Sequence, residues 1–171
     1  MKAKKAFLII FFVFVICLAT STLWAQATDL SIWVGNWLKI TEKGSGFEFD
    51  GSGITKFNYH DVLYWKVIHW DQEDKILSFE ITQYEDGAWW KWELDLYFIA
   101  GTDLDFLCWA NVYNGAFAAR ITGTKKGEGL KTAKFTTLGG FNTGVDETLA
   151  QSLSFTGKLI PESKLPPDMP K

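Results

Sequence analysis

Cysteine and histidine are scarce in this chain, which limits the chemistry it can carry. The 171 residues include two cysteines and two histidines. Beyond the first 27 residues Cys108 is the only cysteine, so no internal disulfide can form there. With His60 and His69 as the only histidines, the sequence lacks a Cys/His cluster for zinc and the histidine pairing typical of serine or cysteine nucleophiles.

A long hydrophobic run is also missing. The apolar stretch from Ala6 to Leu18 is shorter than the roughly 20 residues that a membrane-spanning helix needs, which disfavours a retained membrane anchor. Three lysines precede it, and a small-x-small site follows at 25–27, which together are typical of a secretory signal peptide. We therefore expect residues 1–27 to be a signal peptide cleaved between Ala27 and Thr28. The protein would be secreted or periplasmic, with no membrane span after cleavage.

Positive charge is in short supply as well. Residues 28–171 keep all 20 acidic residues but only 14 of the 17 basic ones, for a net charge of −6. No basic run offsets this charge, so neither nucleic acid nor an anionic membrane surface is an expected partner. A Ser/His/Asp arrangement, a phosphate loop and a cofactor fingerprint are all absent from the sequence. We therefore assign no catalytic residues and no cofactor, and we do not expect an enzyme.

The residues that are abundant favour strands and turns. Aromatic residues, isoleucine, threonine and glycine dominate, and no helical periodicity exceeds about two turns. Asp86-Gly87 and Asn114-Gly115 suit two-residue hairpins, which need positive φ at both central positions, and Ile99 to Gly101 suits a three-residue loop. Turn signals recur at the spacing of about 8 to 12 residues that is typical of all-β proteins.

These three turns predict which side chains lie opposite each other on four strands. The turn at 86–87 gives the pairs Leu77–Leu96, Phe79–Leu94, Ile81–Trp92 and Gln83–Trp90. The loop at 99–101 gives Leu96–Leu104, Leu94–Phe106, Trp92–Cys108 and Trp90–Ala110. The turn at 114–115 gives Phe106–Gly123, Cys108–Ile121, Ala110–Ala119 and Val112–Phe117. All of these positions fall on one continuous apolar face, on which large residues oppose small ones.

The remaining strands complete an antiparallel up-and-down meander of eight or nine strands. We expect them near 31–41, 62–70, 129–137 and 149–159, with a ragged hairpin between 46 and 58. Closure of such a sheet removes its exposed edges, so the sequence favours a closed barrel over a two-sheet sandwich. The barrel domain would span 28–160, and the four prolines in 161–171 predict an unpaired tail.

Short motifs make the chain resemble the lipocalin or calycin family. Gly35-Asn36-Trp37 matches the G-x-W motif with which those barrels begin. Thr102-Asp103 lies about where the family has its T-D-Y motif, although Leu104 replaces the tyrosine, and Arg120 follows on a later strand. The resemblance implies a lipocalin-like barrel, with the arginine packed over Trp37 near the closed end.

The predicted register assigns Arg120 a different partner. It places Arg120 on the outer face opposite Trp109, where a guanidinium over an indole would form a cation–π pair. In either arrangement the arginine has a structural role. We therefore group Gly35, Trp37, Trp109 and Arg120 as structural residues.

The interior offers candidates for a ligand site. Pockets are mostly apolar with a few polar groups that orient the ligand, and the inward-facing positions have this composition. The ligand-binding candidates are Trp90, Trp92, Phe79, Phe106 and Trp65, with Gln83 as the single polar group. The sequence thus predicts a non-catalytic binder of a small apolar or amphipathic ligand. In the alternative, the tryptophans fill the interior and the barrel is packed solid.

The outer face suggests two further sites. Four aromatic residues could form a carbohydrate-contact or protein-contact surface: Trp33, Trp70, Trp89 and Tyr113. The register also sets Glu80 opposite Glu93 and Asp95 opposite Asp105. These carboxylates either stay solvated at a small electrostatic cost or hold a calcium ion, which takes 6 to 8 oxygen ligands.

Overall fold

The computed structural model of the protein describes residues 28–50, 52–112, 115–143 and 149–170. The predicted signal peptide and its cleavage site between Ala27 and Thr28 therefore lie outside the described structure, as do Tyr113 and Asn114. Among the residues that are described, no helix combines the length and the apolar character needed to cross a membrane.

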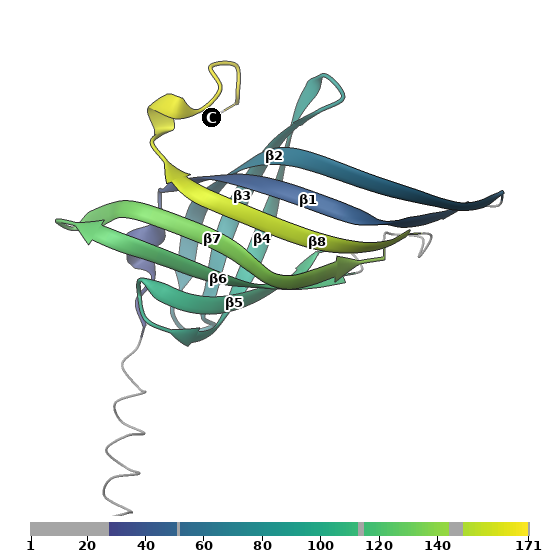
Figure 1. The fold of residues 1–171 in the computed structure, drawn as a ribbon. Coiled ribbons are helices and arrows are strands. Elements are labelled where there is room, and N and C mark those ends of the chain that lie inside the picture. The colour runs from purple at the N-terminus through teal and green to yellow at the C-terminus, as the bar shows by residue number, and fades with distance from the viewer. Residues whose placement is uncertain (1–27, 51, 113–114, 144–148, 171) are drawn as a thin grey trace, which may run out of the picture.

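The fold is an all-β antiparallel meander of eight strands whose hydrogen bonds close into a ring (Figure 1). The strands are β1 (Trp37–Asp50), β2 (Gly53–Asp71), β3 (Ile76–Glu85), β4 (Ala88–Gly101), β5 (Asp105–Val112), β6 (Gly115–Lys126), β7 (Gly129–Asn142) and β8 (Leu149–Ile160). Two short 3-10 helices, η1 (Ser31–Trp33) and η2 (Glu162–Lys164), flank them. Each strand pairs with its sequence neighbours, and β1 pairs with β8. The predicted fold class is thus confirmed.

The first hairpin differs from the prediction at both ends. We expected a strand from residue 31, but 31–33 form η1, and Gly35 turns the chain with a φ of +82° before β1 begins. The hairpin expected to be ragged between 46 and 58 is instead regular over 46–50 and 53–58, the outer half of the β1–β2 pair, which runs out past the other strands (Figure 1).

The β3–β4 register is confirmed pair by pair. Leu77, Phe79, Ile81 and Gln83 lie opposite Leu96, Leu94, Trp92 and Trp90. Asp86 and Gly87 both have positive φ, of 52° and 82°, as the predicted two-residue hairpin requires. A local turn signal was sufficient here because both strands are regular up to the turn.

The predicted β4–β5 register is wrong. Phe98 pairs with Cys108 and Gly101 with Phe106, with a bulge between Phe98 and Ala100. The turn lies after Gly101, where the Thr102 side-chain oxygen accepts hydrogen bonds from the N–H groups of the residues at 104 and 105. The hydroxyl of Thr102 therefore stabilises this turn. The prediction relied on Gly101 alone and placed the turn too early in the chain.

The predicted β5–β6 register is also wrong, by two residues. Val112 pairs with Gly115, so Gly115 is a strand residue, and Cys108 lies opposite Ala119 instead of Ile121. A Cβ on Gly115 would overlap the carbonyl oxygen of Phe141 in β7. The glycine thus permits close packing of two strands. Because the shift is even, every side chain stays on its predicted face.

The β7–β8 pairing is interrupted between Thr136 and Phe141. In the gap the Thr137 hydroxyl bonds both backbone groups of Phe155, donating to the carbonyl and accepting from the N–H. This side chain replaces ladder hydrogen bonds, so the wall stays connected where the register shifts.

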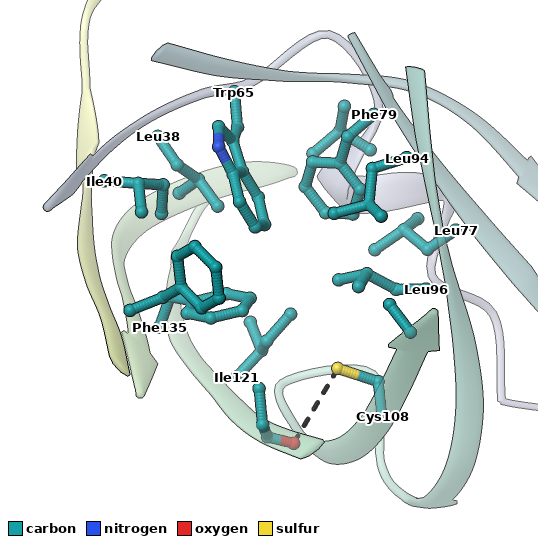
Figure 2. Close-up of a cluster of buried hydrophobic side chains, with 14 of the residues drawn as sticks. Leu38, Ile40, Trp65, Leu77, Phe79, Leu94, Leu96, Cys108, Ile121 and Phe135 are labelled. Carbon is teal, nitrogen blue, oxygen red and sulfur yellow. Dashed lines mark hydrogen bonds between the residues drawn. The ribbon is translucent and has the colours of Figure 1, made fainter. Parts of the chain in front are cut away.

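The barrel interior is filled by aromatic and aliphatic side chains in the half next to η1. Trp33 from η1 is fully buried, makes an edge-to-face contact with Phe106 at 5.5 Å, and donates from Nε1 to the carbonyl of Asp103 at 2.7 Å. Figure 2 shows side chains from opposite walls converging on the centre, among them Leu38, Trp65 and Phe135. Trp33 therefore plugs this end, which we call the closed half.

The segment 161–170 belongs to no strand but packs on the outer wall. Leu165 and Met169 are buried there, and Trp89 Nε1 donates to a carboxylate oxygen of Asp168 at 3.2 Å. Their cluster also contains Trp37, Tyr64 and Ile160. The predicted unpaired tail is therefore attached to the barrel by apolar contacts.

Candidate ligand-binding cavity

A cavity of about 150 Å³ lies in the half of the barrel remote from η1. Its apolar wall is formed by Leu63, Trp65, Ile81, Trp92, Leu94, Val112, Phe117, Leu153 and Phe155. Its polar wall is formed by Glu42, Tyr59, Asn142 and Gln151. An apolar cavity of this volume in another protein holds a benzene molecule, so the space suits a small aromatic or branched group.

Two features of β1 create this space. Inward positions of β1 carry Leu38 and Ile40 near η1, but Glu42 and then Gly44 further along. The ring of Tyr59, directly across from Gly44 on β2, lies where a Cβ on Gly44 would be. The missing side chain therefore lets Tyr59 lie flat against the wall, with its hydroxyl directed at Glu42.

The polar wall is organised around Glu42 and Tyr59. The Tyr59 hydroxyl donates to Glu42 Oε1 at 2.7 Å, and the Gln151 side chain hydrogen-bonds to Tyr59. Asn142, buried on β7, pairs across the ladder with Gln151. Four strands thus bring four polar side chains to one side of an otherwise apolar cavity.

The ionisable groups of this wall are shifted by burial. Burial is the main cause that raises the pKa of Glu42 above its ordinary range; the Tyr59 hydrogen bond opposes the shift, and the negative charges of Asp61 and Glu85 add to it. Burial also raises the pKa of Tyr59, and its bond to Glu42 contributes in the same direction. The site therefore holds a hydrogen-bonded carboxyl in a poorly solvated position, near two further carboxylates.

The structure places the predicted ligand-binding residues in three locations. Trp65 and Trp92 line the cavity. Phe79 and Phe106 are fully packed in the core and do not line it. Gln83, partly buried, is also absent from its wall.

Trp90 corrects the prediction most clearly. It was expected inside, yet its side chain is 57% exposed, with Nε1 donating to the carbonyl of Glu85 at 3.4 Å. Trp90 lies two residues from the start of β4, next to the Asp86-Gly87 turn. Strand alternation indicates the face of the sheet, but at the end of a hairpin that face has no opposite wall to cover it.

The polar residues of the site were missed by the sequence reasoning. Glu42 and Tyr59 lie in the β1–β2 hairpin, for which no register was derived, and Gln151 lies at the start of β8. The signal in the sequence was the alternation along β1, in which Glu42 takes the next inward position after Leu38 and Ile40. Reading it requires the correct start of β1.

The structural residues also have different partners from those predicted. Arg120 lies on the outer face, as the register indicated, but opposite Leu107, and it forms two hydrogen bonds to Asp105, at 2.8 and 2.6 Å. Trp109 stacks on Tyr97 instead, with ring centroids 4.8 Å apart. Neither the predicted Trp109 contact nor the family's arginine–tryptophan contact is formed.

Trp37, the tryptophan of the G-x-W motif, faces the outer wall. A lysine, Lys66, lies over its ring at 5.4 Å, and Leu165 packs against it. The preceding Gly35 has a positive φ and donates its N–H to Val67, which ties the η1 segment to β2. Gly35 and Trp37 thus position the ends of the chain against the barrel.

The predicted outer aromatic surface does not form from the residues proposed for it. Trp33 and Trp70 are buried in the core and Trp89 is half-buried against the 161–170 segment, while Tyr113 lies outside the described residues. Trp33 and Trp70 provide core packing, and Trp89 attaches the tail.

The outer carboxylates are only partly arranged as predicted. Glu80 lies opposite Glu93, as expected, and forms an ion pair with Lys91 at 3.0 Å. Asp95 does not lie opposite Asp105, because the β4–β5 register differs from the predicted one. The Ser78 hydroxyl, across from Asp95 on β3, donates to it at 2.6 Å, and Asp105 binds Arg120. Across the described ranges no group of three or more acidic, histidine or cysteine side chains is placed to hold a metal ion.

Comparison with known proteins returns no relative: no family model, no curated protein and no solved structure matches this chain.

Proposed function

We propose that the protein is exported and binds one small amphipathic ligand, without catalysis, in the cavity of its barrel. The observation that carries the proposal is the combination of a 150 Å³ space, an apolar wall around Trp65 and a polar wall around Glu42. Ligand pockets have this composition, because apolar walls supply affinity and a few polar groups orient the ligand. We also propose that the barrel is lipocalin-like, on the resemblance of Gly35-Asn36-Trp37, which lies before and at the start of β1, to the G-x-W motif.

Isothermal titration with 2-phenylethanol, a neutral probe of suitable size, tests the binding site. The protein beginning at Thr28 should bind one equivalent. Leu153→Trp fills the cavity from β8 and should weaken binding by about tenfold or more, equivalent to about 1.4 kcal/mol. The matched control is Ser152→Trp, which adds the same side chain at the exposed neighbouring position and should leave the affinity unchanged. Equal effects of the two variants, or no binding by the unmodified protein, would contradict the proposal.

Export is tested separately by the intact mass of the protein from its own source. The expected mass is that of a chain beginning at Thr28, since the Lys-rich start, apolar run and small-x-small site are those of a cleaved signal peptide. A mature product that retains residues 1–27 would contradict this part of the proposal. Native mass spectrometry of the same preparation would reveal a ligand that co-purifies with it.

A further inference from the structure

In the part of the chain that the structure describes, the polar wall of the cavity holds one carboxyl group and no cation that could balance its charge. Among the described residues that line the cavity, Glu42 is the only carboxyl or amine group, and no lysine or arginine lies in the wall. The charges that contribute to the raised pKa of Glu42 are those of Asp61 and Glu85, which have the same sign as its own carboxylate. A ligand that enters this cavity therefore meets an electrostatic environment of one sign.

We propose that the ligand of this cavity carries a protonated amine that binds the Glu42 carboxylate, while its apolar body packs against Trp65, Phe117 and Phe155. This inference rests on the proposed function, because it specifies the chemical class of the ligand in the same cavity. The expected class is an aromatic or branched alkyl amine of about ten non-hydrogen atoms, which matches a cavity that holds a benzene-sized group.

The geometry of Glu42 is suited to such a cation. A carboxylate offers about four acceptor positions, and Tyr59 uses one of them through its 2.7 Å hydrogen bond to Oε1. That bond also fixes the carboxylate orientation, since the Tyr59 ring is confined against Gly44. An ammonium group has three donors, and a charge-assisted hydrogen bond is about twice as strong as a neutral one.

Aromatic side chains of the cavity wall favour the same ligand charge. Tyr59 and Trp92 both line the cavity, and the faces of tyrosine and tryptophan rings attract cations by about 0.5 to 2 kcal/mol. A ligand carboxylate would instead be repelled by Glu42, Asp61 and Glu85 in a position where water screens charge poorly. Anionic ligands are therefore disfavoured.

Three probes with similar phenyl bodies and different charge test the inference by isothermal titration at pH 7. They are 2-phenylethylamine, which is protonated at this pH, neutral 2-phenylethanol, and anionic phenylacetate. The amine should bind at least about tenfold more tightly than the alcohol, and phenylacetate should bind more weakly than both. An amine that binds no more tightly than the alcohol would overturn the inference.

The variant that isolates the charge is Glu42→Gln, which keeps the size of the side chain and an oxygen that can accept the Tyr59 hydrogen bond. It should bring the affinities for the amine and the alcohol to within about threefold of each other. The matched control is Glu93→Gln, which removes the same charge from the exposed outer face and should retain the full preference. Persistence of the amine preference in Glu42→Gln, or its equal loss in both variants, would overturn the inference.

The same titrations separate the two proposals. If 2-phenylethanol binds and Leu153→Trp prevents its binding, the cavity is a ligand site regardless of how the amine behaves. If the alcohol binds as tightly as the amine, the inference about ligand charge fails and the proposed function stands. If none of the three probes binds, both fail.

Discussion

The two halves of the barrel are built from the same eight strands but have opposite interiors. Near η1, Trp33, Phe79 and Phe106 fill the space completely, with exposures of at most 1%. In the remote half, Glu42 and Tyr59 form a hydrogen-bonded pair beside a cavity. The alternation of side chains along β1 is continuous through both halves, so the strand pattern alone does not separate a packed core from a binding site.

The difference arises from a small number of side chains. On β1 the inward series changes from Leu38 and Ile40 to Glu42 and Gly44, and in the closed half the side chain of Trp33 enters from outside the strands. Dense packing contributes stability, while an unfilled space costs it. The closed half therefore compensates for the instability of the remote half. The following predictions test this division, from the largest expected effect to the smallest.

Trp33→Ala should disrupt the packing of the closed half. It removes the largest buried plug and its hydrogen bond to Asp103, so we expect a loss of about 3–5 kcal/mol in the free energy of unfolding. Urea denaturation followed by far-UV circular dichroism measures it. The control is Val34→Ala at the exposed adjacent position, with a loss below about 1 kcal/mol. A similar loss in the two variants would show that η1 does not plug the barrel.

Thiol labelling should distinguish the halves along a single strand. Cys108 in the closed half is 1% exposed, and burial raises the pKa of its thiol to about 12, so it should react slowly with a disulfide reagent. Val112→Cys, in a Cys108→Ala background, places a thiol four residues further along β5 beside the cavity. It should react about a hundredfold faster, equivalent to about 2.7 kcal/mol. Equal rates in native protein would refute the proposed difference in packing.

Gly44→Ala should disturb the remote half alone. The added methyl group overlaps the Tyr59 ring, so the ring must move away from Glu42, at a cost of about 1–3 kcal/mol. Loss of the amine preference should accompany this destabilisation. Gly129→Ala is the control, because a Cβ there meets nothing within 4 Å. If Gly44→Ala matched the control in both stability and ligand preference, Tyr59 would not depend on the glycine.

Glu42→Gln should give the smallest effect, and one that depends on pH. Because the pKa of Glu42 is raised in the folded state, its ionisation destabilises the fold as pH rises from the ordinary glutamate range through the raised pKa. The variant lacks this penalty. Its melting temperature should exceed that of the unmodified protein at about pH 7.5, and the difference should shrink at about pH 4. A difference that grows on acidification would show that the pKa shift has the opposite sign.

Sequence reasoning predicted the fold more completely than the pairing of its strands. The β3–β4 register followed from Asp86-Gly87, because that turn is a local backbone property. The β4–β5 and β5–β6 registers depended on the Thr102 side chain and on the contact between Gly115 and β7. The first is a bond between a side chain and the backbone of its own turn, and the second is a contact with a neighbouring strand; a turn signal based on glycine contains neither. The β5–β6 error is an even shift of two residues, so the inward positions of Phe106, Cys108 and Ala110 remained correct.

The candidate site was predicted only in part for a similar reason. Trp65 and Trp92 were identified by their type and their alternation. Trp90 shares that alternation, but it lies so near the end of the β3–β4 hairpin that no opposite wall covers it. The position of a residue along the barrel axis depends on how all eight strands are staggered, which a local pattern does not contain. Glu42 and Tyr59 could not be paired without the register of β1 and β2.

The packing of residues 161–170 on the outer wall has a consequence for the order of folding. Ring closure joins the first strand to the last, Trp37 to Ile160, and Leu165 then packs on Trp37 from the segment that follows. Such contacts between distant parts of a chain form slowly, because a long loop must be ordered before they contribute. During synthesis the edge of β1 that pairs with β8 therefore stays unpaired until β8 has been made. The 161–170 segment can pack over the β1–β8 pair only after that step.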